Sequence, residues 1–321
     1  MRAVGVTEFG GPEALHMVDV PEVHAGSGEV RLAVRAATVN PTDTGGRSGL
    51  YARRAGGVPE LPWIVGMDAA GVVDEVGPDT DGRLAVGDRV MAIVLPSGSH
   101  GAYREQVVLP AASVVPVPAG TDDAAASSLP MNGLTARLAL DRMELRPGDV
   151  LAVTGAAGSF GGYVVQLAKV DGLTVVADAS EADEDLVRGL GADVVLRRGE
   201  GFAAAVRERF PDGVDGLADG AVQSAQVLGA VRDGGVVTTV RGYRGDDTDA
   251  AADRARGVRV LPVLVHDYGL KTAALDRLRE QVEAGQVTLR VADVLPAAHA
   301  AEAHRRLEAG GVRGRLVLDF S

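Results

Sequence analysis

A glycine-rich stretch near the middle of the chain constrains the fold more than any other feature. Residues 150–153 form a short apolar run after a Pro-Gly-Asp turn, as expected of a buried strand. Glycines follow at 155, 158, 161 and 162, and apolar residues then recur at helical spacing as far as Lys169. Glycines at such a turn let the backbone approach a pyrophosphate, which the first N–H groups of the helix then bind. The stretch predicts a dinucleotide site, although a plain β-to-α turn has a similar pattern.

Alternating strand and helix patterns surround this stretch. Strands are expected at 150–153, 174–177, 193–196, 216–218, 236–240 and 259–263. Helices are expected between them at 160–170, 181–190, 202–210 and 221–231. This alternation is typical of an α/β fold with a doubly wound parallel sheet.

The flanking parts of the chain have a different character. Residues 1–120 contain short β-type runs, such as 30–36, 71–76 and 89–94, separated by turn signals and without helices, which predicts a compact barrel-like β domain. Helices are expected at 122–129 and 133–143. A helix at 270–284, a strand at 288–294, a helix at 297–307 and a strand at 315–318 complete the chain.

Composition excludes several classes of function. The 321 residues carry a net charge of −12, which disfavours nucleic acid and anionic membranes as partners. There is no apolar run of the roughly 18 residues needed to span a bilayer, and the N-terminus lacks the apolar core of a signal peptide. With no cysteine, the chain has neither disulfides nor thiolate zinc ligands. These features together predict a cytoplasmic protein.

Several motifs occur in a fixed order along the whole chain. They include Asn40-Pro-Thr-Asp43, Arg47-Ser-Gly-Leu-Tyr51, Gly66-Met-Asp68, the 155–162 turn and Gly314-Arg-Leu-Val-Leu318. In these motifs the chain resembles the zinc-independent quinone oxidoreductase branch of the medium-chain dehydrogenase/reductase superfamily. The resemblance implies a GroES-like β-rich catalytic domain at residues 1–121 and 265–321, with a Rossmann NAD(P)-binding domain at 122–264. It also implies NAD(P)H in a cleft with its nicotinamide facing the β domain, and a homodimer formed by edge strands at 259–263.

The resemblance also shows which metal ligands this chain lacks. Asn40 stands where zinc-dependent members have a cysteine, Met67 stands at the histidine position, and Asp68 replaces a glutamate. The six histidines are scattered without ligand spacing. Hydride transfer to an already electrophilic acceptor needs no Lewis acid, so we expect reduction of a quinone or an α,β-unsaturated carbonyl (enone or enoyl). The alternative is an NADPH-binding structural or regulatory protein with little catalysis.

Two side chains are candidates for catalysis. The resemblance places Asn40 and Tyr51 near the nicotinamide and the substrate. An amide can donate to a developing enolate oxygen, and a tyrosine hydroxyl can donate a hydrogen bond or relay a proton. Turn chemistry before Pro41 and simple packing of Tyr51 are the alternatives. Gly45 stands where some members carry an aromatic residue, which predicts a wider pocket; whether His100 or Tyr243 lines it stays open.

The remaining candidates concern the cofactor. The predicted binding residues of the turn and of the nicotinamide side are Gly155, Ala156, Gly158, Ser159, Phe160, Gly161, Asn132, Thr135, Val240 and Arg241.

The end of the second Rossmann strand distinguishes NADPH from NADH. Asp178 is an acid of the kind that binds the adenosine ribose of NAD, whereas Ser180 corresponds to a residue that binds the 2′-phosphate of NADP. Arg197 and Arg198 follow the third strand and offer the guanidinium groups that suit a phosphate, and Arg315 is a further candidate. We therefore expect NADPH, with NADH as the alternative that Asp178 keeps open.

Overall fold

The computed structural model describes residues 1–55, 61–241 and 255–321. The chain divides into two compact units, and the division falls within helix α4 (Pro130–Met143). The first unit comprises Met1–Met131 and His266–Ser321, and the second comprises Asn132–Val265.

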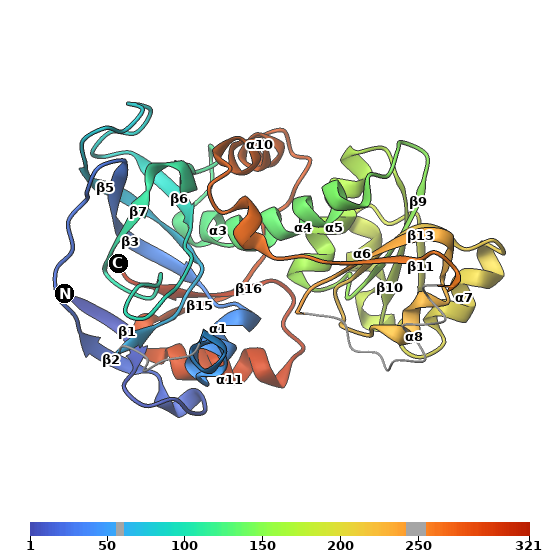
Figure 1. Cartoon of the computed structure of the whole chain (residues 1–321), viewed down its shortest axis with the longest axis horizontal. Coiled ribbons are helices and arrows are strands. Elements are labelled where there is room, and N and C mark those ends of the chain that lie inside the picture. Colours follow the sequence, from blue (N-terminus) through green and yellow to red (C-terminus); the bar gives the residue numbers. More distant parts are fainter. Residues whose placement is uncertain (56–60, 242–254) are drawn as a thin grey trace. The chain divides into compact units, whose positions relative to one another are not determined.

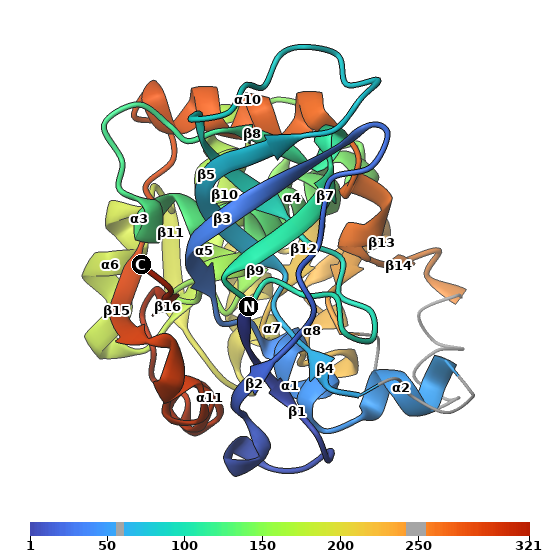
Figure 2. The same cartoon turned by 90° about the vertical axis from the view of Figure 1, so that its left-hand side faces the viewer.

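The first unit is built on β-sheets. Within the described residues, a seven-stranded sheet has the order β15-β16-β3-β5-β6-β8 with β7 paired to β3, and a three-stranded sheet has the order β2-β1-β4. Figure 2 faces this unit and shows β3 between β5 and β7. The strands are β1 (Arg2–Val6), β2 (His16–Asp19), β3 (Glu29–Thr38), β4 (Trp63–Ile64), β5 (Asp68–Val76), β6 (Arg89–Ile93), β7 (Gln106–Pro110), β8 (Val114–Pro116), β15 (Val291–Pro296) and β16 (Arg315–Asp319).

Two helices in the first unit contradict the expectation of strands without helices before residue 120. They are α1 (Pro41–Arg47) and α2 (Leu50–Ala55). Asn40 precedes α1 in an extended conformation, Pro41 occupies the first turn, and the Asp43 carboxylate accepts the N–H of Asn40 at 2.8 Å. Proline at the first helical position and an acid three residues after the cap favour a helix start over the turn that the sequence suggested.

The other helices of the first unit lie close to their expected positions. They are α3 (Asp123–Ser127), α10 (Thr272–Glu283) and α11 (Ala300–Ala309). In Figure 2, α10 lies beside β8. The strand expected at 288–294 begins three residues later than predicted, because it follows the register in which Val291 pairs with Arg315.

The second unit confirms the predicted parallel sheet. Six strands of the described residues follow the order β11-β10-β9-β12-β13-β14, and each neighbouring pair is parallel. Figure 1 labels β9, β10, β11 and β13 of this sheet. The strands are β9 (Val150–Thr154), β10 (Thr174–Ala179), β11 (Val194–Arg197), β12 (Val214–Asp219), β13 (Val231–Thr239) and β14 (Arg259–Pro262). The first unit together with this Rossmann-type sheet has the α/β fold class that the sequence predicts.

The helices of the second unit cover this sheet. They are α5 (Ser159–Val170), α6 (Glu184–Gly189), α7 (Phe202–Arg209) and α8 (Ala225–Leu228). Phe202 of α7 and Leu228 of α8 share a buried cluster with Ala152 and Leu217 of the sheet.

The helix expected at 221–231 was wrong in extent. Only Ala225–Leu228 is helical, and β13 already begins at Val231. The Asp219 carboxylate accepts the backbone N–H groups of Gln223 and Ser224 at 3.0 and 2.8 Å. A side chain that binds nearby backbone donors in this way competes with helix formation, so the helix starts late.

Candidate functional site

The turn between β9 and α5 accepts only glycine at two of its positions. Gly155 has φ +66°, which is a left-handed conformation that side chains rarely adopt. A Cβ atom at Gly161 would lie 2.3 Å from the carbonyl oxygen of Gly155. Gly158 caps α5 in an extended conformation. The structure therefore brings together the six predicted turn residues from Gly155 to Gly161 at the start of α5.

This turn has the features that a phosphate group requires. The first turn of an α-helix carries N–H groups without intrahelical acceptors, and the helix dipole is positive there. Gly158, Ser159 and Phe160 are each half-buried, so the start of α5 is not sealed by other side chains. The absence of Cβ atoms leaves the backbone accessible to a close ligand, and the residues present thus fit a pyrophosphate.

Asp178 is bound to the turn itself. It is buried near the end of β10, and its Oδ1 accepts the N–H of Ala156 at 3.0 Å. Burial raises the pKa of Asp178, while hydrogen bonds from Ala156 and Gly155 and the charge of Arg198 act in the opposite direction. The carboxylate thus helps to hold the glycine turn, a role that its sequence position did not reveal.

The predicted phosphate-binding residues lie at the ends of β10 and β11: Ser180 follows β10, Arg197 ends β11, and Arg198 comes directly after it. Ala179 pairs with Arg197 across these strands, and the N–H of Arg198 donates to the carbonyl of Ala179 at 2.9 Å. The Ser180 hydroxyl donates to Asp183. Arg197 forms an exposed ion pair with Glu181 at 3.6 Å. Ser180 and both arginines therefore lie at one edge of the sheet, as the sequence predicted.

Asp219 and Thr154 lie beside the glycine turn, and the sequence reasoning did not single them out. Both end their strands at the carboxyl edge, and the Thr154 hydroxyl donates to Asp219 at 2.8 Å. Both side chains are at most 1% exposed. A polar residue directly after the expected strand at 216–218 was a usable signal, because ligands of parallel sheets bind at this edge.

The candidates on the nicotinamide side are only partly placed. Val240 and Arg241 directly follow β13, and Arg241 is exposed with φ +65°. Asn132 and Thr135 are buried one turn apart on α4. Tyr243 lies outside the described residues. These positions neither require nor oppose a nearby nicotinamide. The roles of Val240, Arg241, Asn132 and Thr135 therefore stay predictions.

In the first unit, Asn40 is held by a buried carboxylate. Asn40 is 0% exposed and its Nδ2 donates to Asp68 at 2.6 Å, with a longer contact of 3.4 Å to the carbonyl of Thr38. Asp68 also accepts the N–H of Met131 at 2.6 Å. These contacts direct the Asn40 amide into the protein, so they give no support to its predicted role as a donor to a substrate oxygen.

Burial also dominates the electrostatics of this region. It raises the pKa of Asp68 to about 7, although hydrogen bonds from Met131 and Asn40 and the charge of Arg315 oppose the shift. Arg315 lies buried on β16 in this unit, where its charge acts on Asp68. Its described interactions therefore differ from those of the arginines after β11, and they do not support its predicted contact with a 2′-phosphate.

A second buried polar cluster joins α1 to α11. The Tyr103 hydroxyl donates to Asp43 at 3.1 Å and lies 3.3 Å from Nε2 of His304. Arg47 forms an ion pair with Glu308 at 2.6 Å. Burial, followed by the nearby charge of Arg47, lowers the pKa of His304 to about 3, so this histidine is neutral. Tyr103 is fully buried and belongs to the core of this unit.

Tyr51 occupies the space that Gly45 leaves open. A Cβ atom at Gly45 would lie 2.8 Å from Cε2 of Tyr51 and 3.1 Å from its hydroxyl oxygen. Tyr51 is nevertheless 39% exposed. The missing side chain at Gly45 thus gives room to the Tyr51 ring, and the wider pocket stays a prediction.

His100 is a poor proton donor at neutral pH. It is half-buried rather than solvated, and burial and the charge of Arg104 lower its pKa. The neutral form therefore predominates, and we do not assign His100 a role.

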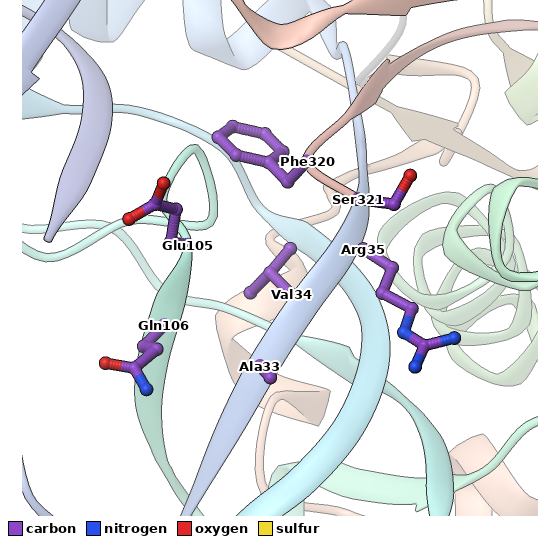
Figure 3. A pocket seen from close by; sticks show the side chains of 7 residues that line it. All are labelled: Ala33, Val34, Arg35, Glu105, Gln106, Phe320 and Ser321. Carbon is purple, nitrogen blue, oxygen red and sulfur yellow. The ribbon is translucent and has the colours of Figure 1, made fainter.

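A surface hollow in the first unit lacks the character of an active site. Figure 3 shows its lining by Ala33, Val34, Arg35, Glu105, Gln106, Phe320 and Ser321. The Glu105 carboxylate is already bound by the side chain and the N–H of Arg2. Because the Glu105 carboxylate is engaged in this way, we assign this hollow no catalytic role.

The described ranges 1–55, 61–241 and 255–321 contain neither a metal cluster nor a membrane-spanning helix. No group of three or more histidine, aspartate or glutamate side chains there is placed to hold a metal ion. In the same ranges, no helix is both long enough and apolar enough to cross a membrane.

Comparison with known proteins identifies the family. A family model described as an alcohol dehydrogenase GroES-like domain matches residues 26–119, and one described as a zinc-binding dehydrogenase matches residues 190–318. The chain is 31% identical to a 2-haloacrylate reductase of Burkholderia over 99% of its own length and 98% of that protein. It is 30% identical to human quinone oxidoreductase over 99% of its length and 97% of that protein.

Other relatives match over less of their length. The match to the rat synaptic vesicle membrane protein VAT-1 homolog is 34% identical over 68% of this chain, but spans only 53% of that protein. The match to mouse quinone oxidoreductase likewise spans 59% of that protein.

Solved structures agree with these matches. A structure titled as an NAD-dependent alcohol dehydrogenase superposes with a TM-score of 0.87 at 31% identity, covering 100% of both chains. A mycobacterial protein solved in complex with NADPH superposes with a TM-score of 0.86 at 30% identity, covering 99% of this chain and 100% of that one. The chain belongs to the medium-chain dehydrogenase/reductase superfamily, in its quinone oxidoreductase and VAT-1 branch.

Proposed function

We propose that this chain is an NADPH-dependent, zinc-independent oxidoreductase that reduces a quinone or the activated C=C of an α,β-unsaturated carbonyl. The observation that carries the proposal is the glycine turn at the start of α5, together with Arg197 at the end of β11 and Arg198 directly after it. Full-length relatives named quinone oxidoreductase and 2-haloacrylate reductase support the substrate class.

NADPH rather than NADH is proposed for reasons of charge. A 2′-phosphate needs cations, and Arg197 and Arg198 lie at the sheet edge beside Ser180. Asp178, the acid that favours NADH, is already bound by the N–H of Ala156. The NADPH complex of a similar mycobacterial protein supports this choice, whereas the structure titled as NAD-dependent makes NADH the cofactor to compare.

The residues of the chain would have separate roles in binding the cofactor and the acceptor. When bound, the reduced nicotinamide supplies a hydride to the acceptor. The turn from Gly155 to Gly161 would bind the pyrophosphate, and Arg198 with Ser180 would bind the 2′-phosphate. The Tyr51 hydroxyl, which is partly exposed on α2, would donate a hydrogen bond to the acceptor oxygen.

In the part of the chain that the structure describes, no group of side chains is placed to hold zinc. The sequence contains no cysteine, and the Asn40 amide is engaged with Asp68. An acceptor that is already electrophilic needs no metal to polarise it, which is why we propose quinones and enones rather than alcohols.

The test is acceptor-dependent consumption of NADPH by the purified protein. Small quinones and enones should each be tried, together with a saturated alcohol and NADP⁺ in the reverse direction. A Gly161→Val variant is the control for contaminating reductases, because any Cβ there would lie 2.3 Å from the Gly155 oxygen. Consumption with quinone or enone by the wild type alone supports the proposal. Binding of NADPH without consumption would instead support a structural or regulatory role. Zinc-dependent oxidation of the alcohol would overturn the proposal of a zinc-independent reductase.

A further inference from the structure

We infer that Asp219 is a positioning residue for the dinucleotide: it holds the loop Gly220–Ser224 against the glycine turn, so that two backbone segments bind the cofactor instead of one. The inference rests on the proposed function. It concerns residues that no sequence motif singled out.

The Asp219 carboxylate accepts three hydrogen bonds. Its Oδ1 accepts the Thr154 hydroxyl at 2.8 Å and the N–H of Gln223 at 3.0 Å, and its Oδ2 accepts the N–H of Ser224 at 2.8 Å. The residue is 1% exposed and ends β12, which pairs directly with β9. A buried carboxylate with this many donors fixes the loop that follows it.

The loop that Asp219 fixes packs directly on the glycine turn. The N–H of Ala221 donates to the Thr154 hydroxyl at 3.2 Å. A Cβ atom at Gly155 would lie 3.0 Å from the carbonyl carbon of Gly220. A Cβ atom at Gly220 would lie 2.7 Å from the backbone carbonyl oxygen of Thr154 and 2.9 Å from Cδ1 of Phe160. A shift of the loop would therefore shift the first residues of the proposed pyrophosphate site.

The loop has an unfavourable backbone conformation. Val222 has φ +57° and Ser224 has φ +55°, although neither is glycine and Val222 is β-branched. Such residues persist only where surrounding contacts determine the conformation, and they are concentrated at functional sites. Asp219 supplies those contacts here.

Two buried polar atoms beside Asp219 need a partner. Within the described part of the chain, neither Gln223 Oε1 nor Thr239 Oγ1 has a hydrogen-bond partner. Thr239 pairs with Asp219 across β13 and β12, and Gln223 is bound to Asp219 through its N–H. Buried polar atoms are normally satisfied, so a ligand that carries hydroxyl and amide groups, as a dinucleotide does, would fit this edge of the sheet.

Asp219→Asn tests the inference, with Asp215→Asn as the matched control. Both aspartates lie on β12 and accept a hydrogen bond from a residue of β9. Asp219 accepts the Thr154 hydroxyl, whereas Asp215 lies at the opposite end of the strand and accepts the N–H of Val150 at 2.8 Å. NADPH affinity should be measured by fluorescence titration and the unfolding temperature by calorimetry. We expect Asp219→Asn to weaken NADPH binding by about tenfold or more, the equivalent of one strong hydrogen bond, and Asp215→Asn to leave it unchanged.

A second variant keeps the test decisive if Asp219→Asn does not fold. Thr154→Val preserves shape but removes the hydroxyl that joins Asp219 to Ala221. It should also weaken NADPH binding, and its effect should not add to that of Asp219→Asn, because both act through one loop. Normal NADPH affinity in a folded Asp219→Asn or Thr154→Val protein, with or without a lower unfolding temperature, would overturn this inference but not the proposed function. A wild type that binds neither NADPH nor NADH would overturn the proposed function as well.

Discussion

At the scale of single residues, the choice of cofactor depends on charges at the ends of β10 and β11. Asp178 contributes a negative charge that is partly offset by Arg198 and by two N–H groups of the glycine turn. Arg197 already has an exposed partner in Glu181, so its guanidinium is less available than that of Arg198. Arg198 is therefore the side chain on which the 2′-phosphate should depend most.

Arg198→Ala should weaken NADPH binding far more than NADH binding. The loss of a charge-assisted hydrogen bond costs about 1.5–3 kcal/mol, which corresponds to roughly ten- to a hundredfold in affinity. Arg197→Ala is the neighbouring comparison and should have the smaller effect. Both cofactors are to be titrated into each protein; equal losses of NADPH and NADH affinity in Arg198→Ala would contradict the assignment.

Gly45 provides a test of Tyr51 that leaves the tyrosine itself in place. Gly45→Ala would put a Cβ atom 2.8 Å from the outer part of the Tyr51 ring, which must then move. Because that ring is partly exposed, stability should change little, while KM for the acceptor should rise and the affinity for NADPH should persist. Gly189→Ala is the control, since Gly189 has open space around its Cβ position. An unchanged KM in Gly45→Ala would argue against a role for Tyr51.

At the scale of elements, the cluster of Tyr103, Asp43 and His304 couples α11 to α1 and should make stability depend on pH. The pKa of His304 falls from 6.5 in the unfolded chain to about 3 in the folded protein. Between these values the unfolded chain binds a proton that the folded protein does not. The contribution of His304 to the free energy of unfolding therefore falls as pH decreases from 6.5, by up to about 1.4 kcal/mol per pH unit. Asp43 and Asp68, whose pKa values are raised by burial to about 7, act in the opposite direction over this range.

His304→Leu isolates this contribution. Asp43 and Asp68 titrate in both proteins, so the difference in free energy of unfolding between wild type and variant reports on His304. Denaturant unfolding at a series of pH values should show this difference shifting in favour of the variant as pH falls below 6.5. A difference that is independent of pH would show that His304 becomes protonated in the folded protein as easily as in the unfolded chain.

Elements with a local pattern could be predicted from the sequence, and elements fixed by distant contacts could not. The run at 150–153 and the glycines that follow it specify β9, the turn and the start of α5 through apolar pattern and backbone freedom alone. The short α8 could not be predicted, because it depends on the hydrogen bonds that Asp219 accepts from the loop before it. Helix α1 was missed because Asn40-Pro41 suits both a turn and a helix start.

The same distinction applies to the candidate site. Strand order brings the positions of Ser180 and the two arginines together, and their binding of a phosphate stays a prediction. The contacts of Asn40 with Asp68 and of Asp178 with Ala156 join residues far apart in sequence. No pattern in the chain indicates which way those side chains turn, so their roles required the structure.

At the scale of the whole molecule, an exposed sheet edge predicts a homodimer. Strand β14 ends the sheet of the second unit, and Leu264 just after it is 61% exposed. An apolar edge strand of this kind needs covering, and pairing of two such edges about a two-fold axis closes the assembly. Light scattering should give twice the chain mass of 32.9 kDa for the wild type.

A charge on the edge strand should abolish that pairing. Leu261→Lys places a cation on β14, and we expect it to be monomeric. Leu270→Lys alters an exposed leucine of the first unit and should keep the wild-type mass. A monomeric wild type at micromolar concentration, or a dimeric Leu261→Lys protein, would rule out this interface.

The chain is proposed to transfer a hydride from NADPH to an activated acceptor, and isotopic labelling can follow that hydride. The most direct test uses NADPH in which both hydrogens at the reactive carbon of the nicotinamide are deuterium, an enone as acceptor, and mass spectrometry with NMR of the product. We expect a saturated ketone with one deuterium on the carbon β to the carbonyl, and a solvent proton on the α carbon. A product without that deuterium, or an unsaturated alcohol labelled at the carbonyl carbon, would contradict the account.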